Sequence, residues 1–133
     1  MMTYLFEEEL NPVNLSDRAK KVLMVLNMEI DKLESGDARN PPTPEGNEKL
    51  KVITGDYQEL VMKVREVREN GGINPKAEPV ADKLEASWKD IYSRMRRYDE
   101  LVVEYNKTHN PKLEFISKRT GDKIEESVKY FDY

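Results

Sequence analysis

The feature that most constrains this chain is a heptad pattern running from residue 79 to residue 108. Apolar residues recur there at gaps that alternate between three and four, the spacing that keeps one face of a helix turned toward partner helices. A helix of about thirty residues is roughly 45 Å long, so other elements must cover its apolar face. We call this face the seam; its residues are Ala81, Leu84, Trp88, Ile91, Met95, Tyr98, Val102 and Tyr105.

A first covering helix is predicted from about residue 15 or 16 to Ser35. Asn14 or Ser16 could cap its start, and Asp17 would suit the positive end of the helix dipole. Gly36 follows directly, at the position where a left-handed residue often closes a helix. The apolar stripe of this helix consists of Ala19, Val22, Leu23, Leu26, Ile30 and Leu33.

A second covering helix is predicted over residues 44–69, after a proline-rich break. Thr43 is the expected N-cap and Pro44 the first helical residue, because proline has no N–H to lose there. Gly55 lies inside this segment, but the apolar pattern continues across it, so we expect one continuous helix. The prolines before it could also form a recognition peptide of the PxxP type, although an interhelix loop accounts for them as well.

The two ends of the chain have weaker patterns. Residues 1–13 are expected to form an N-terminal arm, and residues 112–133 a tail that forms either a short helix or a hairpin. The predicted fold is therefore all-α: one domain, residues 1–133, built as an antiparallel three-helix bundle (up-down-up) with the C-terminal helix or hairpin packed on it.

Composition bears on location and partners. Charged residues make up 36% of the chain, yet the net charge is only −4. A mildly acidic chain is a poor default binder of nucleic acid or of anionic membranes, so neither is expected as a partner. No apolar run approaches a membrane span, and the N-terminus does not resemble a secretory signal. We expect a cytoplasmic protein.

Residues for catalysis are scarce. The chain has one histidine, His109, and no cysteine, so cysteine nucleophiles and thiolate metal sites are excluded. No Glu-x-x-His pair of the kind used by metal-binding bundles occurs, and no glycine-rich phosphate loop is present. We therefore expect a protein that is not an enzyme and holds no metal or cofactor.

One stretch of the long predicted helix resembles a known family. Residues 96–106, Arg-Arg-Tyr-Asp-Glu-Leu-Val-Val-Glu-Tyr-Asn, are similar to the Arg-x-Tyr-Asn-x-x-Val-x-x-Tyr-Asn stretch of LemA-type helical proteins. Asp99 stands where that pattern has asparagine, and the membrane-anchoring N-terminus of that family has no counterpart here. The resemblance implies an antiparallel helical bundle.

The expected function is a non-enzymatic protein–protein interaction module: a small adaptor, regulator or inhibitor. Candidate partner-binding residues are the apolar triplet Tyr4, Leu5 and Phe6, which could instead cap one end of the bundle, and the basic residues Arg94 and Arg97. Two alternatives stay open. One is an acidic inhibitor of viral type that mimics nucleic acid or occludes a basic site on a host enzyme. The other is a structural subunit that self-associates, as a homodimer through the helix over residues 79–108.

Overall fold

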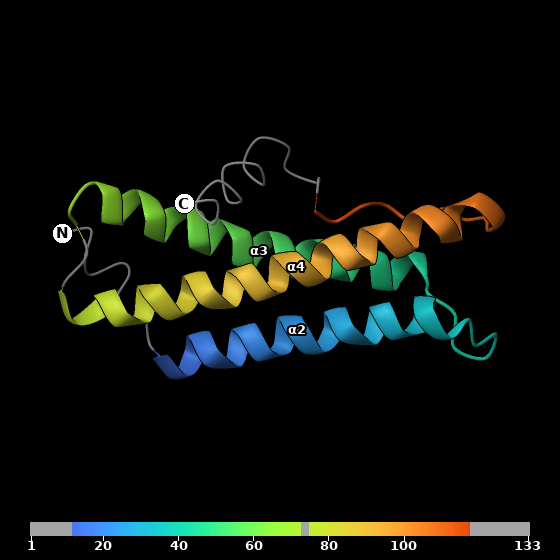
Figure 1. Ribbon diagram of the computed structural model, residues 1–133, viewed down its shortest axis with the longest axis horizontal. Coiled ribbons are helices and arrows are strands. Elements are labelled where there is room, and N and C mark those ends of the chain that lie inside the picture. Colours follow the sequence, from blue (N-terminus) through green and yellow to red (C-terminus); the bar gives the residue numbers. More distant parts are fainter. Residues whose placement is uncertain (1–11, 73–74, 118–133) are drawn as a thin grey trace.

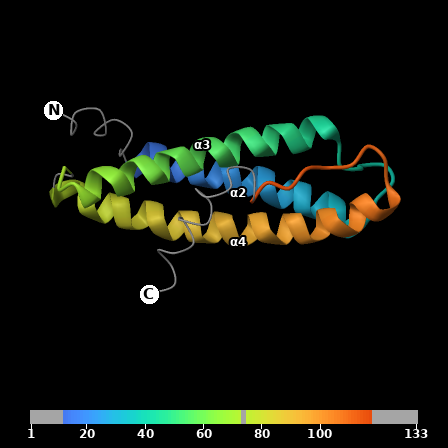
Figure 2. The same cartoon turned by 90° about the horizontal axis from the view of Figure 1, so that it is seen from above.

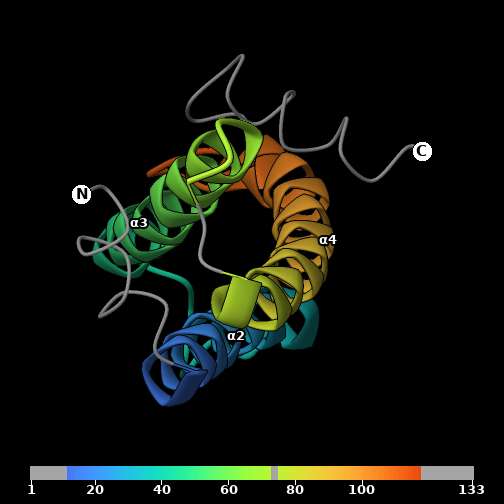
Figure 3. The same ribbon diagram turned by 90° about the vertical axis from the view of Figure 1, so that its left-hand side faces the viewer.

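The computed structural model describes residues 12–72 and 75–117, and this part of the chain is a bundle of three long helices. Their directions alternate along the bundle, and each helix packs against the other two, with α2 and α4 in the most extensive contact (Figure 1). An end-on view shows the three helices arranged around a common axis (Figure 3), and their buried apolar side chains form one cluster. The helices are α2 (Pro12–Ser35), α3 (Pro44–Glu69) and α4 (Glu78–Thr108), with a short 3-10 turn, η1 (Pro75–Ala77), before α4.

The seam of α4 is buried along its length, as its heptad spacing predicts. Seven of its eight residues belong to the core, and Tyr105 at its end is partly buried against that core. Trp88 lies at the centre with none of its surface exposed. Its indole stacks on Tyr57 of α3, with ring centroids 6.2 Å apart, and meets Tyr92 of α4 at 5.9 Å.

The start of α3 confirms the predicted cap. The Thr43 hydroxyl accepts a hydrogen bond from the Gly46 amide at 3.0 Å, and Pro44 is the first helical residue. The helix continues through Gly55 without a break. Gly46 also admits a close neighbour, because a Cβ at this position would lie 2.6 Å from Oε1 of the buried Glu29 side chain of α2. The Glu29 carboxylate thus lies near the positive end of the α3 dipole.

The start of α2 differs from the prediction. The helix begins at Pro12, so Asn14 and Ser16 lie inside it and the caps predicted at these positions are wrong. Proline is favoured in the first helical turn, where its missing N–H removes no hydrogen bond, so Pro12 opens the helix. At the other end Gly36 has a φ of 62°, the left-handed closing residue that the sequence indicates.

After α4 the chain turns back along the bundle. We call residues 109–117 the return segment; it contains neither helix nor strand and runs along the line between α3 and α4 (Figure 2). Residues 112–117 of the predicted C-terminal helix or hairpin are therefore extended or bent chain. The remainder of that prediction, from residue 118 onward, lies outside the described residues.

Polar side chains hold the return segment by its backbone. Asn106 of α4 accepts a hydrogen bond from the Leu113 amide and donates one to the Leu113 carbonyl, both at 2.7 Å. Asn47 of α3 pairs with the Glu114 backbone in the same two-point way, at 3.0 Å, and also donates to the Tyr98 hydroxyl at 2.9 Å. These amide side chains satisfy backbone groups that pair with no strand within residues 12–72 and 75–117.

A buried carboxylate fixes the end of the return segment. Asp99 of α4 is 8% exposed and accepts hydrogen bonds from the Ile116 amide at 2.7 Å and the Ser117 amide at 2.9 Å. It also accepts one from the Ser117 hydroxyl. Leu113 and Ile116 are buried beneath these bonds, so polar and apolar contacts fix the segment together.

None of the helices in the described ranges is both long enough and apolar enough to cross a bilayer.

Trp88→Ala should lower the free energy of unfolding by about 3–5 kcal/mol, the usual cost of removing a large aromatic side chain from a core. The indole N–H has no hydrogen-bond partner among the described residues, so Trp88→Phe loses no hydrogen bond and should cost far less. Urea denaturation followed by circular dichroism measures both variants. A loss below about 1 kcal/mol for Trp88→Ala would contradict the central place of this side chain.

Asp99→Asn introduces the residue found in the LemA-type pattern. One carboxylate oxygen becomes an NH₂ group that faces an N–H donor of the return segment, and a buried donor without an acceptor costs about 1–3 kcal/mol. We expect that loss in urea denaturation, together with faster hydrogen exchange at the Ile116 and Ser117 amides. Asp90→Asn, at an exposed position of the same helix, is the matched control. Unchanged exchange in Asp99→Asn would show that the carboxylate does not fix the segment.

Candidate functional site

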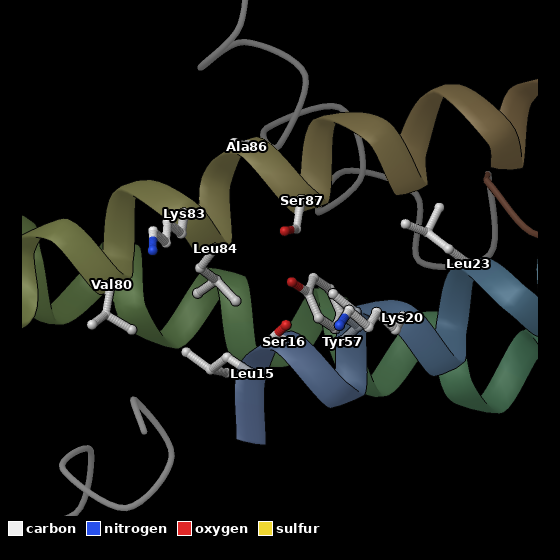
Figure 4. Close-up of a pocket in the computed structure, with 11 residues that line it drawn as sticks. Leu15, Ser16, Lys20, Leu23, Tyr57, Val80, Lys83, Leu84, Ala86 and Ser87 are labelled. Atoms are coloured by element: carbon white, nitrogen blue, oxygen red, sulfur yellow. The ribbon is translucent and has the colours of Figure 1, made fainter. Parts of the chain in front are cut away.

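An apolar groove lies between the N-terminal halves of α2 and α4, with Tyr57 of α3 at its base (Figure 4). Its volume is about 340 Å³, at the lower end of the range for ligand pockets. We call it the α2/α4 groove. Its large apolar lining residues are Leu15 and Leu23 of α2 and Val80 and Leu84 of α4.

The α2/α4 groove is hollow because small side chains line both helices. Ser16 and Ala19 stand on α2, and Ala86 and Ser87 stand on α4. None of these fills the space between the helices as a leucine would. Tyr57 of α3 lies at the base of the space that these small side chains leave (Figure 4).

Two lysines give the rim a positive charge. Lys20 of α2 and Lys83 of α4 both line the groove, and both side chains are exposed. Within residues 12–72 and 75–117 neither ammonium group forms an ion pair, although ion pairs are frequent elsewhere on this surface. An apolar base with two uncompensated cations at the rim suits an apolar segment that carries carboxylates.

Tyr57 places a hydroxyl at the base of the groove. Its side chain is 1% exposed, and burial raises the pKa of Tyr57 to about 12, with a hydrogen bond to Ser87 acting in the opposite direction. The phenol is therefore neutral at physiological pH. Its hydroxyl is engaged by Ser87, and a phenol with so high a pKa is a poor nucleophile or general base.

An ion pair beside the groove fixes one of its walls. The Arg65 guanidinium of α3 donates two hydrogen bonds to the Glu85 carboxylate of α4, each at 2.6 Å. The Arg65 side chain is only 4% exposed, and two-point pairs of this kind are among the stronger polar contacts. Glu85 lies between Leu84 and Ala86, so the pair holds the groove-lining part of α4 against α3.

The arginines singled out from the sequence lie on α4 beyond the groove. Arg94 donates to Asn27 of α2 at 2.8 Å. Arg97 pairs with Glu34 of α2 at 3.0 Å and with Glu100 at 3.4 Å, and these carboxylates raise the pKa of Arg97. Both arginines therefore connect α4 to α2, and their role in binding a partner stays a prediction.

The apolar triplet of the arm, residues 4–6, lies outside the described residues, so the structure does not place it relative to the groove. His109 is exposed and stacks on Tyr105 with ring centroids 4.0 Å apart. In the part of the chain that the structure describes, no three histidine or acidic side chains are grouped so as to hold a metal ion.

No family model matches the chain, and comparisons with curated proteins and with solved structures gave no significant match. The LemA resemblance thus has no support from a family match. Its most distinctive polar residues have a local structural role, since Tyr98, Asp99 and Asn106 all belong to the network that holds the return segment.

The sequence analysis did not find the groove. Lys20 and Lys83 are far apart in the chain, and each lies in a stretch where charged residues are common. The available signal was the pair of small residues at 16 and 19 together with the pair at 86 and 87. That signal acquires meaning only once these stretches are known to lie on facing helices.

The stability of the protein should fall between about pH 10 and pH 12. Burial raises the pKa of both Tyr57 and Tyr98 from 10.0 to about 12. In this window the unfolded state loses protons that the folded state keeps, so the free energy of unfolding decreases, by up to about 1.4 kcal/mol per pH unit for each tyrosine. Urea denaturation across the window measures the decrease.

Tyr57→Phe removes one of the two titrating groups and should roughly halve the decrease. Phenolate absorbance gives an independent readout, since Tyr57 and Tyr98, each with a pKa of about 12, should ionise only near that pH in the folded protein. An equal pH dependence in the wild-type protein and in Tyr57→Phe would contradict the assignment.

Proposed function

We propose that this protein is a non-enzymatic protein-binding module, a small adaptor, regulator or inhibitor, whose α2/α4 groove receives an apolar segment of a partner flanked by acidic residues. The observation that carries the proposal is the apolar groove with Lys20 and Lys83 on its rim, neither of them in an ion pair within the described ranges. Apolar anchors would supply the affinity, and the two ammonium groups would favour acidic partners over basic ones.

The dimensions of the groove agree with peptide recognition. A volume of about 340 Å³ accommodates a few large side chains, and recognition of a helix in a groove uses anchors at positions i, i+3 or i+4 and i+7. The Arg65–Glu85 pair supports the proposal because a wall that is already fixed loses little conformational entropy on binding.

The proposal also includes the location of the protein and the packing of the chain beyond the return segment. We envisage a cytoplasmic up-down-up bundle in which the chain beyond the return segment continues to pack on the helices. The acidic inhibitor and the self-associating subunit stay predictions. A dimer through α4 would need a face other than the seam, because the seam residues are already buried in the core of this chain.

The proposal is tested by selecting random twelve-residue peptides from a display library on the full-length protein. We expect enrichment of peptides that combine two or three large apolar residues with Asp or Glu. Their binding should perturb the amide resonances of Ser16, Ala19 and Leu84. Enrichment of basic peptides, or resonance changes confined to other surfaces, would contradict the proposal.

A groove-filling variant sharpens the test. Ala86→Phe places a ring in the groove and should abolish binding of the selected peptides. Ser93→Phe adds a ring at an exposed position of the same helix that does not line the groove, so binding should be unchanged. Equal loss in both variants would show that the groove is not the binding site.

A further inference from the structure

We infer that the α2/α4 groove is occupied in the free protein by the chain's own N-terminal segment, residues 4–9, Tyr-Leu-Phe-Glu-Glu-Glu. The inference rests on the proposed function, because it takes the groove to be a peptide-binding site. It goes beyond that function in naming an occupant and a consequence for regulation.

The attachment point of the segment lies beside the groove. The described part of the chain begins at Pro12, and Leu15, the first residue that lines the groove, is one helical turn further along α2. Phe6 precedes Pro12 by six residues, which span about 20 Å when extended. The α2 wall of the groove, from Leu15 to Leu23, is about 12 Å long. A segment that turns back at the start of α2 therefore reaches the whole groove.

The chemistry of the segment matches that of the groove. Tyr4, Leu5 and Phe6 offer three consecutive large apolar side chains, suited to a lining of leucine, valine and alanine. The three glutamates at 7–9 follow directly and bring carboxylates to a rim whose two ammonium groups lack ion pairs within the described ranges. The same combination of apolar anchors and acidic flank defines the partner segment proposed above.

Tethering gives the segment an advantage over a free ligand. A short connection to Pro12 holds it at a high effective concentration near the groove. A partner must displace it, so the apparent affinity for the partner falls in proportion to the fraction of molecules with an empty groove. The N-terminal segment thus competes with the partner from within the same chain and raises the partner concentration needed for binding.

The experiment uses the full-length chain with the photo-crosslinking amino acid benzoylphenylalanine in place of Phe6. After irradiation, mass spectrometry should locate crosslinks within one chain, at Ala19, Val80 or Leu84. Lys20→Glu/Lys83→Glu in the same protein should lower the yield by about fivefold or more, since each ion pair changes from attraction to repulsion. Lys21→Glu/Lys89→Glu makes the same change in net charge on the same two helices at exposed positions that do not line the groove. It should leave the yield unchanged.

Three outcomes would overturn the inference: crosslinks that avoid the groove, an equal drop in yield in both charge variants, and crosslinks that join two chains, which would assign the groove to the arm of a second copy. Failure here is distinguishable from failure of the proposed function. If the library yields peptides that bind the groove but residue 6 forms no crosslink there, only the inference is wrong and the proposed function stands. A library without such peptides would remove the proposed function.

Discussion

The constraint on which the structure depends is the need to cover the seam of α4 along its whole length. This helix has 31 residues, against 24 in α2 and 26 in α3. Because the seam spacing alternates between three and four, its side chains face two neighbours. Both α2 and α3 must therefore lie along α4, and the aromatic contact between Trp88 and Tyr57 fixes their common core. Where α2 and α3 leave the end of α4, the return segment buries Leu113 and Ile116.

Local chemistry predicted much of this fold, and contacts distant in sequence account for what it missed. Three features each depend on a few neighbouring residues, so the sequence predicts them directly. They are the seam, the start of α3 at Thr43 and Pro44, and the end of α2 at Gly36. Pro12 is ambiguous in sequence, because proline both ends helices and begins them. The return segment is held by hydrogen bonds between side chains and a distant backbone, such as Asn47 with Glu114, and such bonds leave no periodic trace.

The candidate site was harder to predict than the fold, because the groove exists where small side chains leave the space between two helices unfilled. Serine and alanine at 16, 19, 86 and 87 are ordinary residues in any helix. Arg94 and Arg97 attracted attention because they are neighbours in sequence. The structure shows both of them hydrogen-bonded to α2, whereas Lys20 and Lys83 line one groove only through the packing of α2 on α4.

The two ends of the bundle differ in a way that bears on function. At the end where α3 begins, Asn47, Asp99 and Asn106 form hydrogen bonds with a backbone that would otherwise be buried without partners, so opening it would be costly. At the end where α2 and α4 begin, no hydrogen bond or ion pair joins the α2 wall of the groove to its α4 wall among the described residues, and the Arg65–Glu85 pair keeps the α4 wall in place. A site that exchanges occupants needs a fixed frame and a low cost of opening, and only the second end combines them.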